Sequence, residues 1–149
     1  MTRPCVLDIK LGSQAYNAKK LERQRWKMEI STSAELGFRF CGISYFERSQ
    51  DGALSEEMTL INKYACRSFD QEQMRSHFRK FLCIENSSST AGASTDQQPF
   101  LVKFYQQAFE QIKQVLAEHS HGIRFYGSSI LVIYCADSVE RARVSNDAS

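Results

Sequence analysis

The chain has 149 residues, of which 42% are hydrophobic and 24% are charged, and this composition excludes a disordered or fibrous protein. One compact domain is expected at this length, without disulfides or a structural metal. The net charge of +2 predicts neither a nucleic-acid partner nor a membrane partner. No apolar run approaches the roughly 20 residues of a membrane span, and the opening residues do not resemble a signal peptide. A soluble protein of the cytoplasm, the nucleus or both is therefore predicted.

The five cysteines predict reduced thiols rather than a disulfide framework or a zinc site. They are odd in number and widely spaced, and they include no C-x-x-C pair. His119 and His121 lie two residues apart with no cysteine nearby, and two candidate ligands do not complete a site. No metal-binding side chains are therefore predicted.

The first predicted element is a strand over residues 4–12. Its apolar side chains recur with a period of two, so one face is expected to be buried. Asp8 and Lys10 lie two residues apart and therefore project together from the opposite face. A helix is predicted next, over residues 19–30, which are rich in strong helix formers.

This strand and helix carry the main charge asymmetry of the chain. The first thirty residues hold seven basic and three acidic side chains, an excess that suits a polyanionic small molecule. Lys19, Lys20 and Arg23 have only their charge in favour of such a role. The alternative interpretation is that they form a solvated helix face.

A hairpin and a second helix are predicted in the middle of the chain. Residues 37–46 and 59–64 are typical of strands, and a polar, glycine-containing turn at residues 49–53 separates them. Ser68 followed by Gln71 resembles a capping box. The apolar residues after it repeat at the spacing of one helix face up to about Leu82.

A loop, a helix and a strand are predicted in the second half of the chain. Residues 86–99 are rich in Ser, Thr, Gly and Gln, which indicates a flexible loop inserted within one domain. A 3.6-residue stripe predicts a helix over residues 101–116. Residues 123–135 are typical of a strand buried on both faces, and the polar tail from residue 136 is expected to fray. Together the elements predict an α+β fold with a mostly antiparallel sheet and packed helices.

Two motifs resemble those of the inositol polyphosphate kinase family. Pro4, Asp8, Lys10 and Gly12 form P-x-x-x-D-x-K-x-G, which is similar to the family's first motif. The segment FYGSSILVIY resembles its second motif, and the stretches STSAELGFRFCGISYF and NKYACRSF between them are also similar to the family. The Ser-Thr-Ser-Ala stretch and the later Cys-Gly most resemble the inositol hexakisphosphate kinase branch.

The resemblance implies a protein-kinase-like fold and an activity. In the family, ATP and Mg²⁺ support phosphorylation of an inositol polyphosphate. Conversion of inositol hexakisphosphate to a diphosphoinositol product is expected here, because of the branch resemblance. The alternative within the family is a multikinase acting on inositol tris- and tetrakisphosphates.

The resemblance also implies roles for particular residues. Asp8 would orient or deprotonate the acceptor group, and Lys10 would contact the phosphates, including the transferred one. The remaining candidates are Lys27, Lys63 and Arg67 on the inositol-phosphate side, and Ser128 and Ser129 on the nucleotide and metal side. The alternatives are an exposed Asp8–Lys10 salt bridge and two serine hydroxyls that bond to nearby backbone.

The chain departs from the family pattern in several places. Ile130 replaces the usual first Leu of the second motif, and Cys66 stands where the family commonly has Gly, which is expected to alter a turn. Neither the ATP-gripping strands nor the metal-binding Asp-Phe pair can be identified. Residues 1–149 are thus expected to form a partial kinase domain that binds inositol hexakisphosphate weakly and lacks activity alone. The alternative from another class is a non-catalytic module that binds inositol phosphates or a protein.

Overall fold

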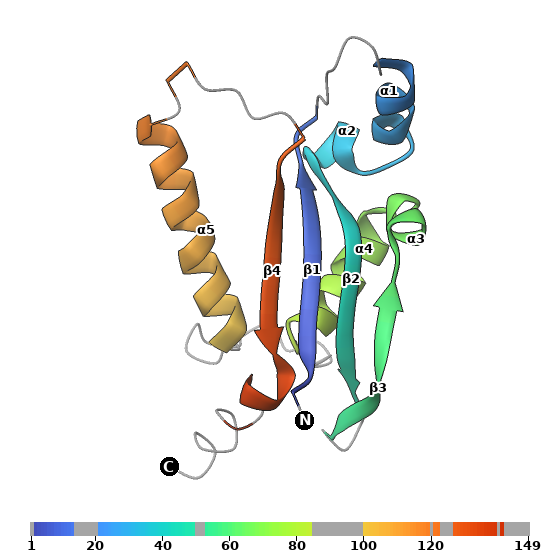
Figure 1. Ribbon diagram of the computed structural model, residues 1–149, viewed down its shortest axis with the longest axis vertical. Coiled ribbons are helices and arrows are strands. Elements are labelled where there is room, and N and C mark those ends of the chain that lie inside the picture. The colour runs from blue at the N-terminus through green and yellow to red at the C-terminus, as the bar shows by residue number, and fades with distance from the viewer. Residues whose placement is uncertain are drawn as a thin grey trace, which may run out of the picture.

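The computed structural model describes residues 2–13, 21–49, 53–84, 100–119, 121–122, 127–139 and 141 (Figure 1). The strands are β1 (Pro4–Leu11), β2 (Phe38–Arg48), β3 (Leu54–Ile61) and β4 (Ser129–Cys135). The helices are α1 (Leu21–Glu29), α2 (Ser33–Leu36), α3 (Lys63–Arg67), α4 (Gln71–Phe81) and α5 (Phe100–His119). The predicted loop at residues 86–99, Lys19, Lys20 and the side chain of Arg23 lie outside the described part.

The strand β1 has the predicted alternation of buried and partly exposed side chains. Cys5 and Leu7 are fully buried and Ile9 is 8% exposed, whereas Asp8 and Lys10 are only half-buried. Because neighbouring side chains of a strand point to opposite faces, Asp8 and Lys10 project away from the core. The prediction that they share the face opposite the apolar one is confirmed.

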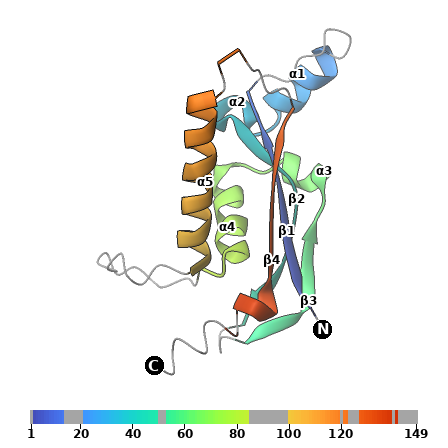
Figure 2. The ribbon, with the colours of Figure 1, turned by 60° about the vertical axis from the view of Figure 1, so that its left-hand side comes forward.

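The four strands form one antiparallel sheet in the order β3-β2-β1-β4. Figure 2 shows α4 and α5 on the same side of this sheet. The core lies between them and includes Leu7, Ile43, Phe81, Leu101 and Val132. None of the described helices covers the other side of β1 and β4. We call this side the open face. It carries Val6, Asp8 and Lys10 of β1, whose register partners on β4 are Ile133, Leu131 and Ser129.

The strands β2 and β3 form the predicted hairpin, but its second arm starts and ends earlier than expected. The strand β3 stops at Ile61, and the predicted strand residues up to Tyr64 instead enter α3. The reason is the side chain of Asn62, which accepts hydrogen bonds from the backbone N–H groups of Tyr64 and Ala65 and so begins a helix. Cys66 is buried within this helix, so it does not alter a turn.

The helix α4 is confirmed, but its capping box is not the one predicted. Asp70, rather than Ser68, is the N-cap, and its carboxylate accepts from the backbone N–H of Gln73 at 2.7 Å. The Gln73 side chain accepts in return from the Asp70 backbone N–H at 3.0 Å. Ser68 instead ends α3, where its hydroxyl donates to the Ala65 carbonyl.

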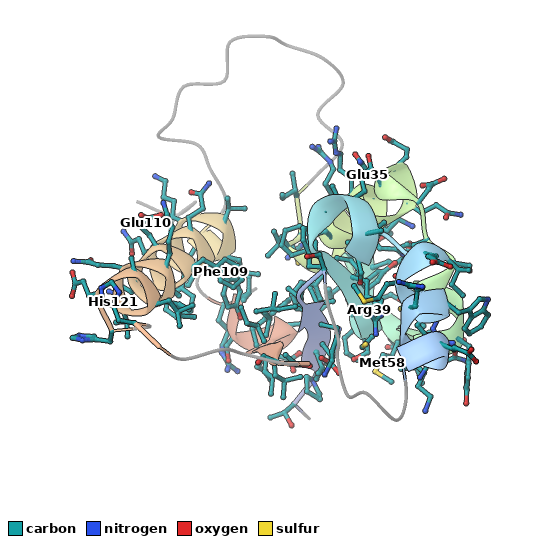
Figure 3. The ribbon with its side chains drawn as sticks, turned by 90° about the horizontal axis from the view of Figure 1, so that it is seen from above. Glu35, Arg39, Met58, Phe109, Glu110 and His121 are labelled. Atoms are coloured by element: carbon teal, nitrogen blue, oxygen red, sulfur yellow. The ribbon has the colours of Figure 1, made fainter. Side chains whose placement is uncertain are left out.

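The helix α5 is confirmed, and it packs mainly through its first half. Leu101 is buried, and the Tyr105 hydroxyl donates to the Ile133 carbonyl at 3.0 Å. Figure 3 shows Phe109 directed toward the sheet and Glu110 directed away from it. The stripe continues into the second half of α5, where Ile112, Val115 and Leu116 are exposed.

The strand β4 lies at the edge of the sheet and is buried on one face only. Val132 is 4% exposed, whereas Leu131 and Ile133 are 58% and 55% exposed. The prediction of a strand buried on both faces is therefore wrong, because no described element covers the open face at β4. The predicted fraying from residue 136 is also wrong for residues 136–139, which are helical. Asp137, in this segment, forms an ion pair with Arg3, in which its Oδ1 lies 3.3 Å from the Arg3 Nε.

All five cysteines are free, as predicted. Among the described residues, none of the helices is long and apolar enough to cross a membrane.

Candidate functional site

A surface hollow of about 470 Å³ lies on the open face, where β1, β2 and the start of α3 meet. Its floor is formed by Val6 and Asp8 of β1 and by residues 41–44 of β2. Leu60 and Ile61 of β3 continue the lining, and Asn62, Lys63 and Tyr64 complete it. Two of the predicted site residues, Asp8 and Lys63, therefore share one hollow although they are far apart in the sequence.

The carboxylate of Asp8 is the acidic group of this hollow. Its Oδ1 atom is buried and has no hydrogen-bond partner. The facing residue on β2 is Gly42, so no side chain covers the carboxylate from that strand. Asp8 and Lys10, which both belong to the described part of the chain, form no ion pair. The alternative interpretation of the two residues as an exposed salt bridge is therefore not supported. A buried acceptor without a donor costs free energy of folding, and such atoms are often retained for chemistry.

The side chain of Lys10 turns toward the second motif. Its Nζ donates to the carbonyl of Gly127, the residue before the two serines. Lys10 is also the register partner of Ser129, so the two motifs lie on adjacent strands. Gly127 has a φ of +64°, a left-handed conformation that favours glycine. The structure thus brings together two motifs that the sequence separates widely.

Arg39 is a candidate that the sequence reasoning missed. It is the register partner of Lys10 on β2, and its guanidinium donates to the Ser33 hydroxyl at 2.8 Å, beside α2 (Figure 3). Like charges on facing residues of neighbouring strands are unfavourable unless an anion lies between them. Only the strand register could have revealed this pair, because Arg39 belongs to neither motif.

The candidates Lys63 and Arg67 both lie over the ring of Tyr64, and of the two only Lys63 lines the hollow. The Lys63 Nζ lies 5.1 Å from the centre of the Tyr64 ring. The Arg67 Cζ lies 5.7 Å from the Tyr64 ring and 5.7 Å from the Trp26 ring of α1. In the described part of the chain, neither cation forms an ion pair. The aromatic rings stabilise the two cations without neutralising them.

Lys27, Ser128 and Ser129 lie outside the lining of the hollow. Lys27 is half-buried on α1, and its carbonyl accepts from the Ser31 hydroxyl at 2.7 Å. The Ser128 carbonyl accepts from the Leu11 backbone N–H at 2.9 Å, while the side chain of Ser129 is exposed. Among the described residues, neither serine hydroxyl bonds to backbone.

The described residues do not assemble a metal site by themselves. They contain no group of three His, Cys, Asp or Glu side chains placed to hold an ion. Among the described residues, Asp8 is the one carboxylate that lines the hollow, and Mg²⁺ prefers near-octahedral coordination by oxygen atoms.

Comparisons with solved structures support the α+β fold. The inositol phosphate multikinase of S. cerevisiae, solved in complex with ADP and Mn²⁺, matches with a TM-score of 0.56 and 26% identity. The match covers 97% of this chain and 59% of that one. A second structure, described as an inositol phosphate multikinase, has a TM-score of 0.64 and 20% identity over 89% of this chain and 60% of that one.

Comparisons with curated proteins give relatives from one group of kinases. Inositol hexakisphosphate kinase 1 of Rattus norvegicus is 35% identical over 88% of this chain. Inositol hexakisphosphate kinase 2 of Homo sapiens is 32% identical over 97% of this chain. This chain spans 28% and 31% of the length of these two relatives. The sequence model of the family described as inositol polyphosphate kinase matches residues 1–148. The chain therefore belongs to the inositol polyphosphate kinase family.

Proposed function

We propose that the protein to which this chain belongs transfers phosphate from ATP to an inositol polyphosphate, and that the open face binds the acceptor. The observation that carries this proposal is the unpartnered Oδ1 of Asp8, in a hollow that Lys63 and Tyr64 also line. Phosphoryl transfer depends on positioning and on charge stabilisation more than on covalent chemistry by the protein. A free carboxylate oxygen beside cations suits both needs.

In this proposal Asp8 acts on the acceptor group. When the acceptor is a hydroxyl, Oδ1 accepts its proton as the oxygen attacks the phosphorus atom. When the acceptor is already a phosphate, as in inositol hexakisphosphate, Oδ1 orients a protonated phosphate oxygen by accepting its hydrogen bond. Both roles require an acceptor that no protein donor occupies, which agrees with the environment of Oδ1.

The surrounding cations bind phosphates in the same proposal. Lys63 lines the hollow from α3, and Arg67 lies over the ring of Tyr64, which also lines it. Lys10 and Arg39 are register partners on β1 and β2. The Lys10 Nζ gives up its hydrogen bond to the Gly127 carbonyl and donates instead to an oxygen of the transferred phosphate, which is a stronger acceptor. Clustered cations favour a dense polyanion over a singly charged substrate.

The substrate we propose is inositol hexakisphosphate, with ATP as phosphate donor and Mg²⁺ as the accompanying ion. The curated relatives named above are inositol hexakisphosphate kinases, and ADP and Mn²⁺ occupy the yeast multikinase structure. A multikinase acting on inositol tris- and tetrakisphosphates is the second candidate, supported by the two solved multikinases. We place the protein in the cytoplasm, the nucleus or both.

The test is product analysis with the complete gene product. It is incubated with labelled ATP and Mg²⁺, and separately with inositol tris-, tetrakis- and hexakisphosphate. Label in a diphosphoinositol product, lost in Asp8→Asn, is the expected result. Label only in products of the less phosphorylated substrates would favour the multikinase. No transfer to any of them, together with retained calorimetric binding of the hexakisphosphate, would favour a non-catalytic binding module.

A further inference from the structure

The guanidinium of Arg67 lies over two aromatic side chains from different helices. Trp26 comes from α1 and Tyr64 from the start of α3, and each ring centre is 5.7 Å from the Arg67 Cζ. We call Trp26 and Tyr64 the aromatic clamp. Both rings remain accessible, at 50% and 67% exposure. Because half of its surface is exposed, Trp26 adds little to the core, and its clearest contact is the guanidinium of Arg67.

Among the described residues, the guanidinium of Arg67 has no hydrogen-bond partner. Its Nε is buried with no hydrogen-bond partner, and no acceptor for the rest of the guanidinium lies among the described residues. Aromatic rings attract the cation through their faces but accept none of its in-plane N–H groups. The two rings therefore hold the guanidinium beside their faces without satisfying its in-plane N–H donors.

The charge around Tyr64 indicates what those donors bind. Lys63 and Arg67 both lie within about 6 Å of the same ring, and no carboxylate among the described residues pairs with either of them. Two cations so placed repel each other, and an anion bound between them would offset the repulsion. A phosphate suits a planar guanidinium especially well, because two parallel N–H groups can bind two of its oxygens.

We propose that Trp26 and Tyr64 are positioning residues, which hold Arg67 in the orientation that binds a substrate phosphate and thereby bring α1 to the edge of the site. This inference rests on the proposed function, because the substrate is taken to be an inositol polyphosphate. Neither aromatic residue needs to touch the reacting atoms. Their contribution is to reduce the orientations that Arg67 must give up when the phosphate binds.

The chain provides its own reporter for this proposal, since Trp26 is its single tryptophan. Titration with inositol hexakisphosphate is expected to give a saturable change in Trp26 emission, because the anion alters the charge beside the indole. The change should be absent in Arg67→Gln. Sodium sulfate at matched ionic strength should not reproduce it.

Calorimetric titration of variants with the same ligand separates positioning from folding. Trp26→Ala and Tyr64→Ala are expected to weaken binding by about 2- to 5-fold each, the range of an exposed cation–π contact, while Trp26→Phe and Tyr64→Phe restore it. Phe100→Ala is the matched control, because Phe100 is also an exposed aromatic residue, at 63%, and begins α5. Its affinity should equal that of the wild type.

The outcomes distinguish the clamp from the proposed function. Binding with no change in Trp26 emission, and equal affinities in the alanine variants and the wild type, would overturn the clamp and leave the proposed function intact. A lower melting temperature of Trp26→Ala without weaker binding would assign Trp26 a structural role and also overturn it. No binding by the wild-type chain would overturn both.

Discussion

Replacing Asp8 with valine is expected to stabilise the fold while abolishing phosphate transfer. An unsatisfied buried acceptor costs about 1 to 3 kcal/mol, and valine is favoured over aspartate in strands on a scale that spans about 1 kcal/mol. Asp8 is only half-buried, so solvent reduces the first cost. We therefore expect the free energy of unfolding to rise by about 1 to 2 kcal/mol, which corresponds to roughly 2 to 8 °C in Tm for a chain of this size.

Asp8→Asn is the matched control, because it removes the charge and keeps the shape. Its free energy of unfolding is expected to lie between those of the wild type and Asp8→Val. Its affinity for inositol hexakisphosphate should be equal or higher, by up to about 5-fold, because a charge at 4 Å in water contributes about 1 kcal/mol of repulsion. Both variants should lose transfer in the complete gene product.

The assays are urea denaturation of the 149-residue chain followed by circular dichroism, and calorimetry for the affinity. Loss of more than about 1 kcal/mol of stability in Asp8→Val would refute the reasoning, since it would mean that the carboxylate is satisfied in the folded state.

Three further predictions concern the cap of α4, the cations and the thiols. Asp70→Ala should lower the free energy of unfolding by about 1 kcal/mol in urea denaturation and Ser68→Ala by less, since only Asp70 caps the helix; the reverse order would contradict the observed cap. Lys10→Ala should weaken binding of inositol hexakisphosphate about 10-fold and Lys27→Ala measurably, whereas Lys113→Ala on α5 should not weaken it. Added salt should weaken binding by the wild type steeply. Equal loss of affinity in all three variants would mean that diffuse charge, rather than a site, attracts the ligand. Iodoacetamide at pH 8 should modify Cys135 before Cys66, because hydrogen bonds with Ser138 lower the pKa of Cys135, while burial raises the pKa of Cys66 to about 11. Mass spectrometry after brief labelling would show the order of modification. Earlier labelling of Cys66 would contradict the prediction.

The elements that follow from local periodicity could be predicted from the sequence. The alternation in β1 and the 3.6-residue stripe of α5 are properties of neighbouring residues, and both elements formed where expected. The errors arose where one polar side chain decided between two local structures. Asn62 began a helix inside a predicted strand, and Asp70 displaced Ser68 as the cap of α4. Both outcomes depend on which side chain accepts hydrogen bonds from the free backbone N–H groups at the start of the helix.

Of the candidate site, only the residues that belong to the two motifs could be predicted from the sequence. Asp8 and Lys10 were identified through the family resemblance, and the period of two placed them on the correct face. Arg39 and the aromatic clamp could not be found in this way, because their importance depends on the register of β2 and on the approach of α1 to α3. Such neighbours are set by tertiary packing, which no local pattern specifies.

The two faces of β1 show how one strand serves both stability and the proposed chemistry. Its odd-numbered residues, such as Leu7, fill the core with apolar side chains that are almost fully buried. Its even-numbered residues leave an unpartnered carboxylate oxygen at Asp8 and a lysine at Lys10 that faces Arg39 across β2. These groups do not favour folding, so they must be held by the packing on the reverse side. A strand that is central in its sheet and paired on both edges fixes Asp8 most firmly, which agrees with a role that depends on its position.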